Sequence, residues 1–277
     1  MNKRVKIIRE LKVLFKVFLE KKSIIKNLLN TNLQNVDRTL EEYIGCEILK
    51  KFPTSSIIGE ETGISINKNS ELIFIIDRID GTKCFYNGHK DFSISITCAI
   101  NDDIVAAFLF IPLLDVENFF WWFEGEEMWF NSSRCKILPT IPKISSVNLV
   151  IPPFQEWAIK THHAIIKNSQ ISQLGSIAYR IALVCAGKYD AGVNILSENV
   201  MVWDIITGIA FLKKVDGIII NENQESVQYK NGKLFPEKSK FYLFGQKDIV
   251  NQVYIKYEPY LQSDFFESLL FKTHNLE

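Results

Sequence analysis

An apolar run ends in two acids at residues 72–82, which read LIFIIDRIDGT. The first six residues of this stretch lack the alternation of a half-exposed strand, so they predict a central strand covered on both faces. Asp77 and Asp80 stand where this strand leaves the sheet, and Gly81 and Thr82 follow at once. Because ligand sites of sheet proteins form at such strand ends, we expect functional side chains here.

The same segment offers carboxylate ligands for a metal ion and backbone N–H groups for a phosphate. Carboxylates such as those of Asp77 and Asp80 are ligands that Mg²⁺ prefers, usually together with substrate phosphate. The N–H groups of Gly81 and Thr82 can turn toward an anion. Taken alone, the pattern also fits an ordinary turn after a strand that ends at Asp77. A calcium loop fits less well, since the D-x-D-x-D-G spacing and its closing glutamate are absent.

Further acids lie along the chain on either side of this strand. Glu60 and its neighbour Glu61 precede it, while Asp37 and Asp204 each open a predicted helix. Acids at helix starts are common as caps and as partners of the helix dipole, so either one alone carries little weight. Their combination with the two strand-end acids favours a carboxylate cluster.

Two α+β halves describe the rest of the chain. The first half predicts helices around residues 8–18 and 37–51 and an antiparallel meander of strands at 92–100, 104–111 and 117–123. The second half predicts helices at 154–168, 176–186 and from 204, and strands at 189–195, 217–220 and 241–244. A Pro-containing stretch separates the halves, so we expect subdomains at 1–145 and 146–277.

Composition is that of an ordinary globular chain. Hydrophobic residues make up 47% of its 277 residues, and 32 basic side chains balance 32 acidic ones. This balance gives no sign of a nucleic-acid polymer or a membrane as partner, and the basic N-terminal segment is expected to be a solvated face. That segment lacks the apolar stretch of a signal peptide, and the longest apolar run, 104–114, is too short to span a bilayer. We expect a cytoplasmic protein.

Four segments, in order, resemble the signature segments of the inositol monophosphatase superfamily. They are IGEE (58–61), IIDRIDGTKCF (75–85), GSIAYRIALVCAGKYDAGV (175–193) and WDIITGIAFLKKVDG (203–217). The resemblance implies a layered α/β/α/β/α fold with two closely packed subdomains. It also implies a Mg²⁺-dependent phosphatase that hydrolyses a small phosphorylated metabolite with metal-activated water. Two or three Mg²⁺ ions, a homodimer and sensitivity to lithium are further expectations from the resemblance.

The resemblance assigns metal ligands residue by residue. Glu60, Asp77 and the carbonyl of Ile79 would bind the first Mg²⁺. Asp77, Asp80 and Asp204 would bind a second ion. All of these donors are oxygens, which suits a hard cation.

The resemblance also assigns catalytic and substrate-binding residues. Thr82, paired with Glu60, would orient the metal-bound water and help to deprotonate it, with Asp37 supporting this pair and Glu61 nearby. The phosphate and substrate contacts would come from Asp80, Gly81, Thr82, Lys83, Gly175, Ser176, Ala178, Glu198 and Asp204. Counting back from Asp204, the acid that grips inositol hydroxyls in the family falls at Ser197, with Glu198 one place off.

The chain departs from the family pattern at two positions near the two acids. Arg78 replaces the usual proline, which removes a rigid turn and predicts either a contact to an acidic substrate or a solvent-facing side chain. Cys84 replaces the asparagine of inositol phosphatases, and Lys83 is similar to the 3′(2′),5′-bisphosphate nucleotidases and the histidinol-phosphate phosphatases. Both of these enzymes remain alternatives, as does a non-catalytic regulator that binds metal or phosphate.

Overall fold

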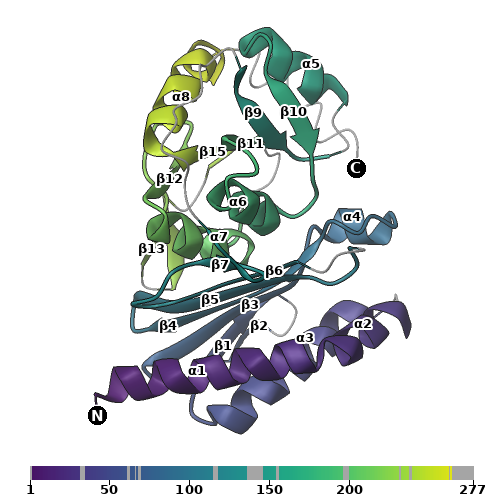
Figure 1. The fold of residues 1–277 in the computed structure, drawn as a ribbon, viewed down its shortest axis with the longest axis vertical. Helices are drawn as coiled ribbons and strands as arrows, with labels where there is room; N and C mark the ends of the chain where they lie inside the picture. Colours follow the sequence, from purple (N-terminus) through teal and green to yellow (C-terminus); the bar gives the residue numbers. More distant parts are fainter. Residues whose placement is uncertain are drawn as a thin grey trace. The chain divides into compact units, whose positions relative to one another are not determined.

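The computed structural model describes residues 2–31, 35–60, 63–65, 67, 70–114, 118–135, 146–153, 156–195, 200–230, 232–236, 239–261 and 263. The chain divides into two compact units, Met1–Arg134 and Cys135–Glu277, which are described separately below (Figure 1). The boundary expected between residues 145 and 146 remains a prediction.

Unit 1 is built on an eight-stranded sheet with the order β2-β1-β3-β4-β5-β6-β7-β8. Only β1 and β3 run parallel among these neighbours, so the meander expected from the sequence forms the antiparallel part of the sheet. The strands are β1 (Ser56–Gly59), β2 (Gly63–Ser65), β3 (Leu72–Asp80), β4 (Ser93–Ile100), β5 (Asp103–Ile111), β6 (Asn118–Phe123), β7 (Trp129–Phe130) and β8 (Ser133–Arg134).

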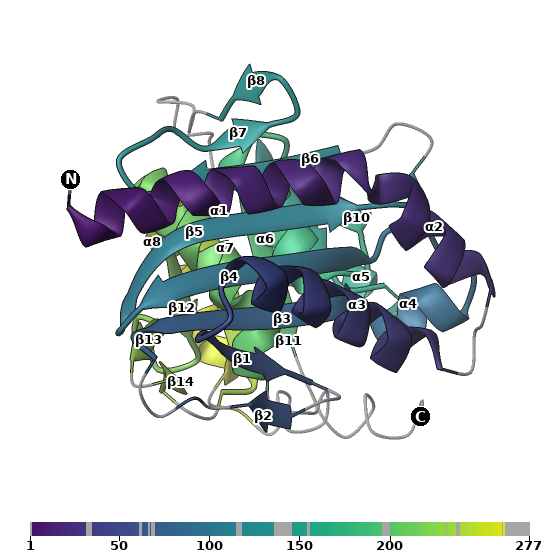
Figure 2. The same cartoon turned by 90° about the horizontal axis from the view of Figure 1, so that it is seen from below.

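Three helices cover one face of this sheet (Figure 2). They are α1 (Lys3–Glu20), α2 (Lys22–Thr31) and α3 (Val36–Lys51). Leu11, Phe15 and Phe18 recur at helical spacing on α1 and pack into one core with Phe74 of β3 and Phe108 of β5. The first and third helices confirm the prediction, whereas α2 was not expected.

The strand β4 is buried along its whole length. Its apolar residues Ile94, Ile96 and Cys98 belong to the helix-covered core, as their alternation predicted. The small polar residues of the other face, Ser93 and Ser95, are also buried. Side chains of both faces of β4 are therefore shielded from solvent beside β3, which fits the unbroken apolar run that precedes Asp77.

Unit 2 has a five-stranded mixed sheet, order β10-β9-β11-β15-β12, and a separate hairpin of β13 and β14. The strands are β9 (Asn148–Ile151), β10 (Gln170–Gln173), β11 (Ala191–Ile195), β12 (Gly217–Asn221), β13 (Gln228–Lys230), β14 (Lys233–Phe235) and β15 (Phe241–Gln246). Its helices are α5 (Glu156–Ile165), α6 (Ile177–Cys185), α7 (Val202–Lys214) and α8 (Lys247–Leu261). The last helix and the hairpin were not predicted from the sequence.

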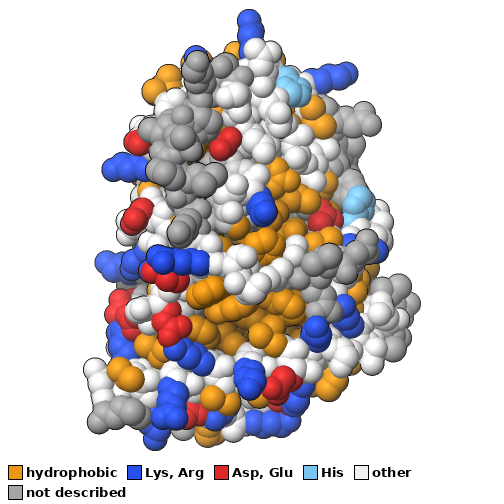
Figure 3. Space-filling model, viewed as in Figure 1, with side chains coloured by type: hydrophobic (Ala, Val, Ile, Leu, Met, Phe, Trp, Pro, Cys, Tyr) orange, Lys and Arg blue, Asp and Glu red, His pale blue; other side chains and the backbone are white. Residues whose placement is uncertain are grey.

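Four basic residues of α1, Lys3, Arg4, Lys12 and Lys16, form ion pairs with acids of unit 1. Lys3 binds Glu71 at 2.6 Å, and Arg4 binds Glu124 at 2.6 Å. Figure 3 shows basic and acidic side chains next to one another along the lower part of the face that it draws. This mutual neutralisation agrees with the solvated face expected for α1. Within the described residues, no helix has the length and apolar character needed to cross a membrane.

A buried histidine in unit 2 predicts how the stability of the chain depends on pH. His162 of α5 is hydrogen-bonded to the buried hydroxyl of Tyr257 on α8. Burial, together with the neighbouring His163, lowers the pKa of His162 to about 3. Since an unfolded histidine titrates near pH ~6.5, the unfolded chain binds a proton that the folded chain excludes between these two values. The stability from this group is complete above pH ~6.5 and falls by ~1.4 kcal/mol per pH unit below it.

His162→Asn is therefore expected to flatten the loss of unfolding free energy between about pH 6.5 and pH 5, measured by urea denaturation. The side chain of asparagine still offers a polar partner to Tyr257 but does not titrate. His163→Asn is the matched control, because it changes an exposed histidine of the same helix and keeps the burial that is the larger cause of the low pKa of His162, so the loss of stability below pH ~6.5 should remain. An unaltered slope in His162→Asn would contradict this account.

Candidate active site

The end of β3 carries a bulge that decides where its acids point. Asp77 lies opposite Ser95 of β4 and Asp80 lies opposite Ser93, so three steps along β3 match two steps along β4. The extra residue shifts the alternation of side chains: Ile76 and Ile79 both face the helix-covered core. Each acid directly follows one of these isoleucines, so Asp77 and Asp80 both point to the opposite face. The strand thus extends to Asp80, and the expectation that it ends at Asp77 is wrong.

The turn after β3 is fixed by backbone and hydroxyl contacts. Gly81 has φ 93° and ψ 38°, a left-handed conformation that favours glycine, and it precedes the short helix α4 (Thr82–Tyr86). The hydroxyl of Thr82 donates to the carbonyl oxygen of Ile79 at 2.8 Å, and the N–H of Ile79 donates to Asp77 Oδ1 at 3.1 Å. These contacts hold the predicted ligands Asp77 and Ile79 in place, while the expected pairing of Thr82 with Glu60 remains a prediction.

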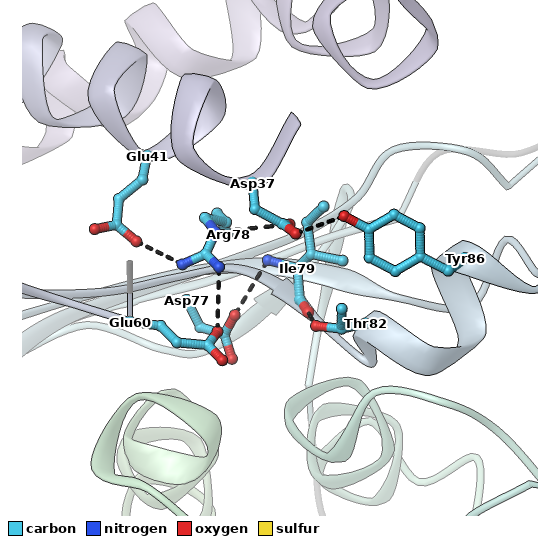
Figure 4. Close-up of polar contacts among 8 residues, drawn as sticks. All are labelled: Asp37, Glu41, Glu60, Asp77, Arg78, Ile79, Thr82 and Tyr86. Atoms are coloured by element: carbon cyan, nitrogen blue, oxygen red, sulfur yellow. Dashed lines mark hydrogen bonds and ion pairs between the residues drawn. The ribbon is translucent and has the colours of Figure 1, made fainter. Parts of the chain in front are cut away.

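Arg78 lies among three carboxylates (Figure 4). Its Nη1 contacts Glu41 Oε2 at 2.7 Å, its Nη2 lies 3.5 Å from Glu60 Oε2, and its Nε lies 3.6 Å from Asp37 Oδ1. Only 2% of the Arg78 side chain is exposed, so the expectation of a solvent-facing arginine is wrong. Burial opposes the charged form of Arg78, but the hydrogen bond to Glu41 and the nearby carboxylates outweigh it and raise the pKa of the guanidinium.

Glu41 of α3 is the residue that sequence reasoning missed. Its side chain is 1% exposed, and it rests against Gly59 of β1. A Cβ at Gly59 would stand 2.3 Å from Glu41 Oε1, so any other residue there would force this carboxylate to move. Glu41 follows Asp37 by one helical turn, next to the buried position Leu40. An acid inside the buried stripe of a helix was the signal that could have predicted a buried basic partner.

Asp37 links the cluster to α4. It lies in the first turn of α3, as expected, and it accepts a hydrogen bond of 2.8 Å from the hydroxyl of Tyr86. Asp37 was expected to support the pair Glu60–Thr82. In the structure Asp37 contacts Arg78 and Tyr86, and Arg78 in turn contacts Glu60, while the support of the pair Glu60–Thr82 remains a prediction.

The remaining predicted residues lie in unit 2, on α4 or outside the described parts. Asp204 lies in the first turn of α7 and accepts a bond of 2.6 Å from the N–H of Met201, so it caps this helix whether or not it binds metal. Ser176 accepts from the N–H of Tyr179 at 2.9 Å and caps α6. Ala178 is buried, Gly175 is half-buried, and Lys83 is exposed on α4. Residues Glu61, Ser197 and Glu198 lie outside the described residues.

The donors at the end of β3 suit a magnesium ion. Asp77 is 1% exposed and Asp80 is 7% exposed, and the carbonyl of Ile79 lies between them in the sequence. All are oxygen ligands, and Mg²⁺ usually takes one or two carboxylates together with water and phosphate. Among the described residues, no group of three or more His, Cys, Asp or Glu side chains is arranged so that it could hold a metal ion by itself. The complete ligand set, with Glu60 and Asp204, stays a prediction.

Comparison with known proteins identifies the family of the chain. The model of the inositol monophosphatase family matches residues 5–248. The chain belongs to the inositol monophosphatase family. Among its relatives, a protein named Nus factor SuhB from Pasteurella multocida is 25% identical over 242 residues, which cover 85% of this chain and 86% of that protein. A fructose-1,6-bisphosphatase/inositol-1-monophosphatase from Aquifex aeolicus is 28% identical over 189 residues, 66% of this chain and 69% of that protein.

Solved structures of the family share the fold of this member. The crystal structure of SaIMPase-II with bound 2′AMP has a TM-score of 0.73 at 23% identity and covers 96% of this chain and 98% of its own. Inositol monophosphatase-II from Staphylococcus aureus has the same TM-score and identity and covers 91% and 97% of the two chains. The predicted layered α+β fold of the inositol monophosphatase type is therefore confirmed.

Proposed function

We propose that this family member is a Mg²⁺-dependent phosphomonoesterase that hydrolyses a small inositol phosphate-like metabolite by direct attack of water. The observation that supports this most is the bulge in β3. It turns the two buried carboxylates, Asp77 and Asp80, to one face, immediately before the left-handed turn at Gly81. A pair of buried carboxylates next to the backbone N–H groups of a turn is what a metal–phosphate complex requires.

Each residue has a defined task in this proposal. Asp77, Asp80, Asp204, Glu60 and the carbonyl of Ile79 would hold the metal. When bound, Mg²⁺ would lower the pKa of its bound water and neutralise negative charge on the phosphate. The Ile79 N–H fixes the direction of the Asp77 carboxylate beforehand, so less reorganisation is needed on binding.

The turn after β3 would bind the phosphate and take part in proton transfer from the attacking water. The N–H groups of Gly81 and Thr82 would donate to phosphate oxygens, as backbone turns do in other anion sites. The Glu60 carboxylate, acting through the hydroxyl of Thr82, would take the proton of the attacking water. No side-chain nucleophile is invoked, because neither a GxSxG segment nor a Cys–His signature is present in the sequence.

The substrate is assigned from family membership and from the residues beside the site. Lys83 is exposed next to Thr82, where it could meet a second phosphate, and a solved relative is named for bound 2′AMP. A 3′(2′),5′-bisphosphate nucleotidase is therefore the first alternative, and a histidinol-phosphate phosphatase is the next. We also propose a homodimer in the cytoplasm that lithium inhibits, all on the strength of family membership.

A regulatory, non-catalytic role is the second candidate function. Several relatives carry the name Nus factor SuhB, including the protein from Pasteurella multocida. Arg78 also adds a fixed positive charge where the family resemblance leads one to expect none. A regulator of this kind would bind metal or phosphate without turning substrate over.

The test is phosphate release from inositol 1-phosphate, 3′-phosphoadenosine 5′-phosphate and histidinol phosphate, each with Mg²⁺ and with a chelator. Turnover that needs Mg²⁺ supports the phosphatase, and the preferred substrate decides between the three enzymes. If none of the three releases phosphate while calorimetry still detects Mg²⁺ binding, the regulatory role is favoured instead. Turnover that survives the chelator would overturn the metal-dependent mechanism.

A further inference from the structure

Arg78 is a cation built into the wall of the proposed metal site. It approaches three acids, Asp37, Glu41 and Glu60, of which Glu60 is a proposed metal ligand. Arg78 also directly follows the ligand Asp77 in β3. An ionised guanidinium in this place changes the charge that an incoming divalent cation meets.

The three contacts of Arg78 differ in how firmly they are held. The contact to Glu41 is the shortest, 2.7 Å, and both side chains are almost fully buried, at 2% and 1% exposed. The carboxylate of Glu41 occupies the space that Gly59 leaves by lacking a Cβ. Glu60 lies 3.5 Å away and its side chain is 41% exposed. Glu41 is therefore the anchor of Arg78, and Glu60 is the partner that can exchange.

We propose that Arg78 and Glu41 act as a pair of positioning residues that hold Glu60 and compete with the metal for its carboxylate. This inference rests on the proposed function, because Glu60 is a metal ligand only there. The anchored guanidinium keeps Glu60 beside the site and offsets the mutual repulsion of Asp37, Glu41 and Glu60. Metal binding must then displace the ion pair Arg78–Glu60 and tolerate a fixed positive charge nearby. The site is thus tuned toward weaker, readily reversible Mg²⁺ binding.

The experiment is a calorimetric Mg²⁺ titration of the full chain and of the double variant Glu41→Gln/Arg78→Met. This variant removes both members of the buried pair, so that neither charge is left buried alone. We expect its Kd for Mg²⁺ to be about tenfold lower than that of the wild type, since the guanidinium that competes with the metal for Glu60 is gone. The matched control is Arg38→Met/Glu42→Gln. It removes an exposed ion pair from α3, the helix that carries Glu41, and should leave the Kd unchanged.

A second variant keeps the test decisive if the double variant fails to fold. Arg78→Lys retains a charge for Glu41, but a single ammonium lacks the fork that also reaches Glu60, so the Kd should fall about threefold. A folded variant with an unchanged or higher Kd overturns the inference. The variant Glu60→Gln distinguishes a failure of the inference about Arg78 from a failure of the proposed function. If wild type binds Mg²⁺ and Glu60→Gln raises the Kd tenfold, the ligand role of Glu60 stands by itself; if wild type binds no Mg²⁺, both proposals are overturned.

Discussion

Replacing Asp80 by Asn is expected to abolish phosphate release, with kcat reduced by at least ~10³-fold, while the fold is retained. Asp80 is buried at the bulge of β3, on the same face as Asp77. Asparagine has nearly the same shape, so packing is preserved, but it removes the negative charge that would hold the metal and offset its desolvation. The loss should appear in kcat at saturating substrate and should not be recovered by added Mg²⁺.

The measurement is phosphate release together with thermal denaturation of the same preparations. Asp102→Asn is a suitable control, because this aspartate is exposed in the turn between β4 and β5 of the same unit. It should retain full activity. If Asp80→Asn kept the activity of the wild type, the assignment of the metal site to the end of β3 would be wrong.

The position of β3 could be predicted from the sequence because a fully buried strand needs an unbroken apolar run. The same local reasoning gave α3, α6 and the meander from β4 to β6, whose periodicities are carried by consecutive residues. It missed α2, which packs mainly on the helix α3, and α8, which packs on the preceding strand β15 and contains Pro259, a residue that argues locally against a helix. The hairpin of β13 and β14 was missed because it comprises two three-residue strands with little alternation to detect.

The site was predicted in its residue types but not in its geometry. The sequence places Asp77 and Asp80 close together, but three residues apart along a regular strand would put them on opposite faces. The bulge that reverses this depends on pairing with β4, and no local pattern encodes it. Similarly, Arg78 was expected to contact substrate or solvent because its partner Glu41 lies 37 residues earlier in the chain. Contacts of that sequence separation are set by the tertiary fold.

Replacing Arg78 by Met is expected to lower the free energy of unfolding by ~3–5 kcal/mol. The reason is the carboxylate that remains, since Glu41 is 1% exposed and its contact with Arg78 is a direct hydrogen bond of 2.7 Å. Methionine fills much of the volume of the arginine stem, so lost packing contributes little. The main cost is a charged group left in the protein interior without its cation.

The double variant Glu41→Gln/Arg78→Met distinguishes this cause from a simple packing defect. Removing both charges should restore most of the lost stability, because replacing a whole buried ion pair is often neutral. The comparison is made by urea denaturation in the presence of chelator, so that differences in metal binding do not contribute. Arg38→Met, which breaks the exposed pair with Glu42 on α3, should cost less than ~1 kcal/mol. A double variant as unstable as Arg78→Met alone would show that Arg78 stabilises the fold through its packing and not through Glu41. In that case the anchoring of Arg78, on which its competition with the metal depends, would also fail.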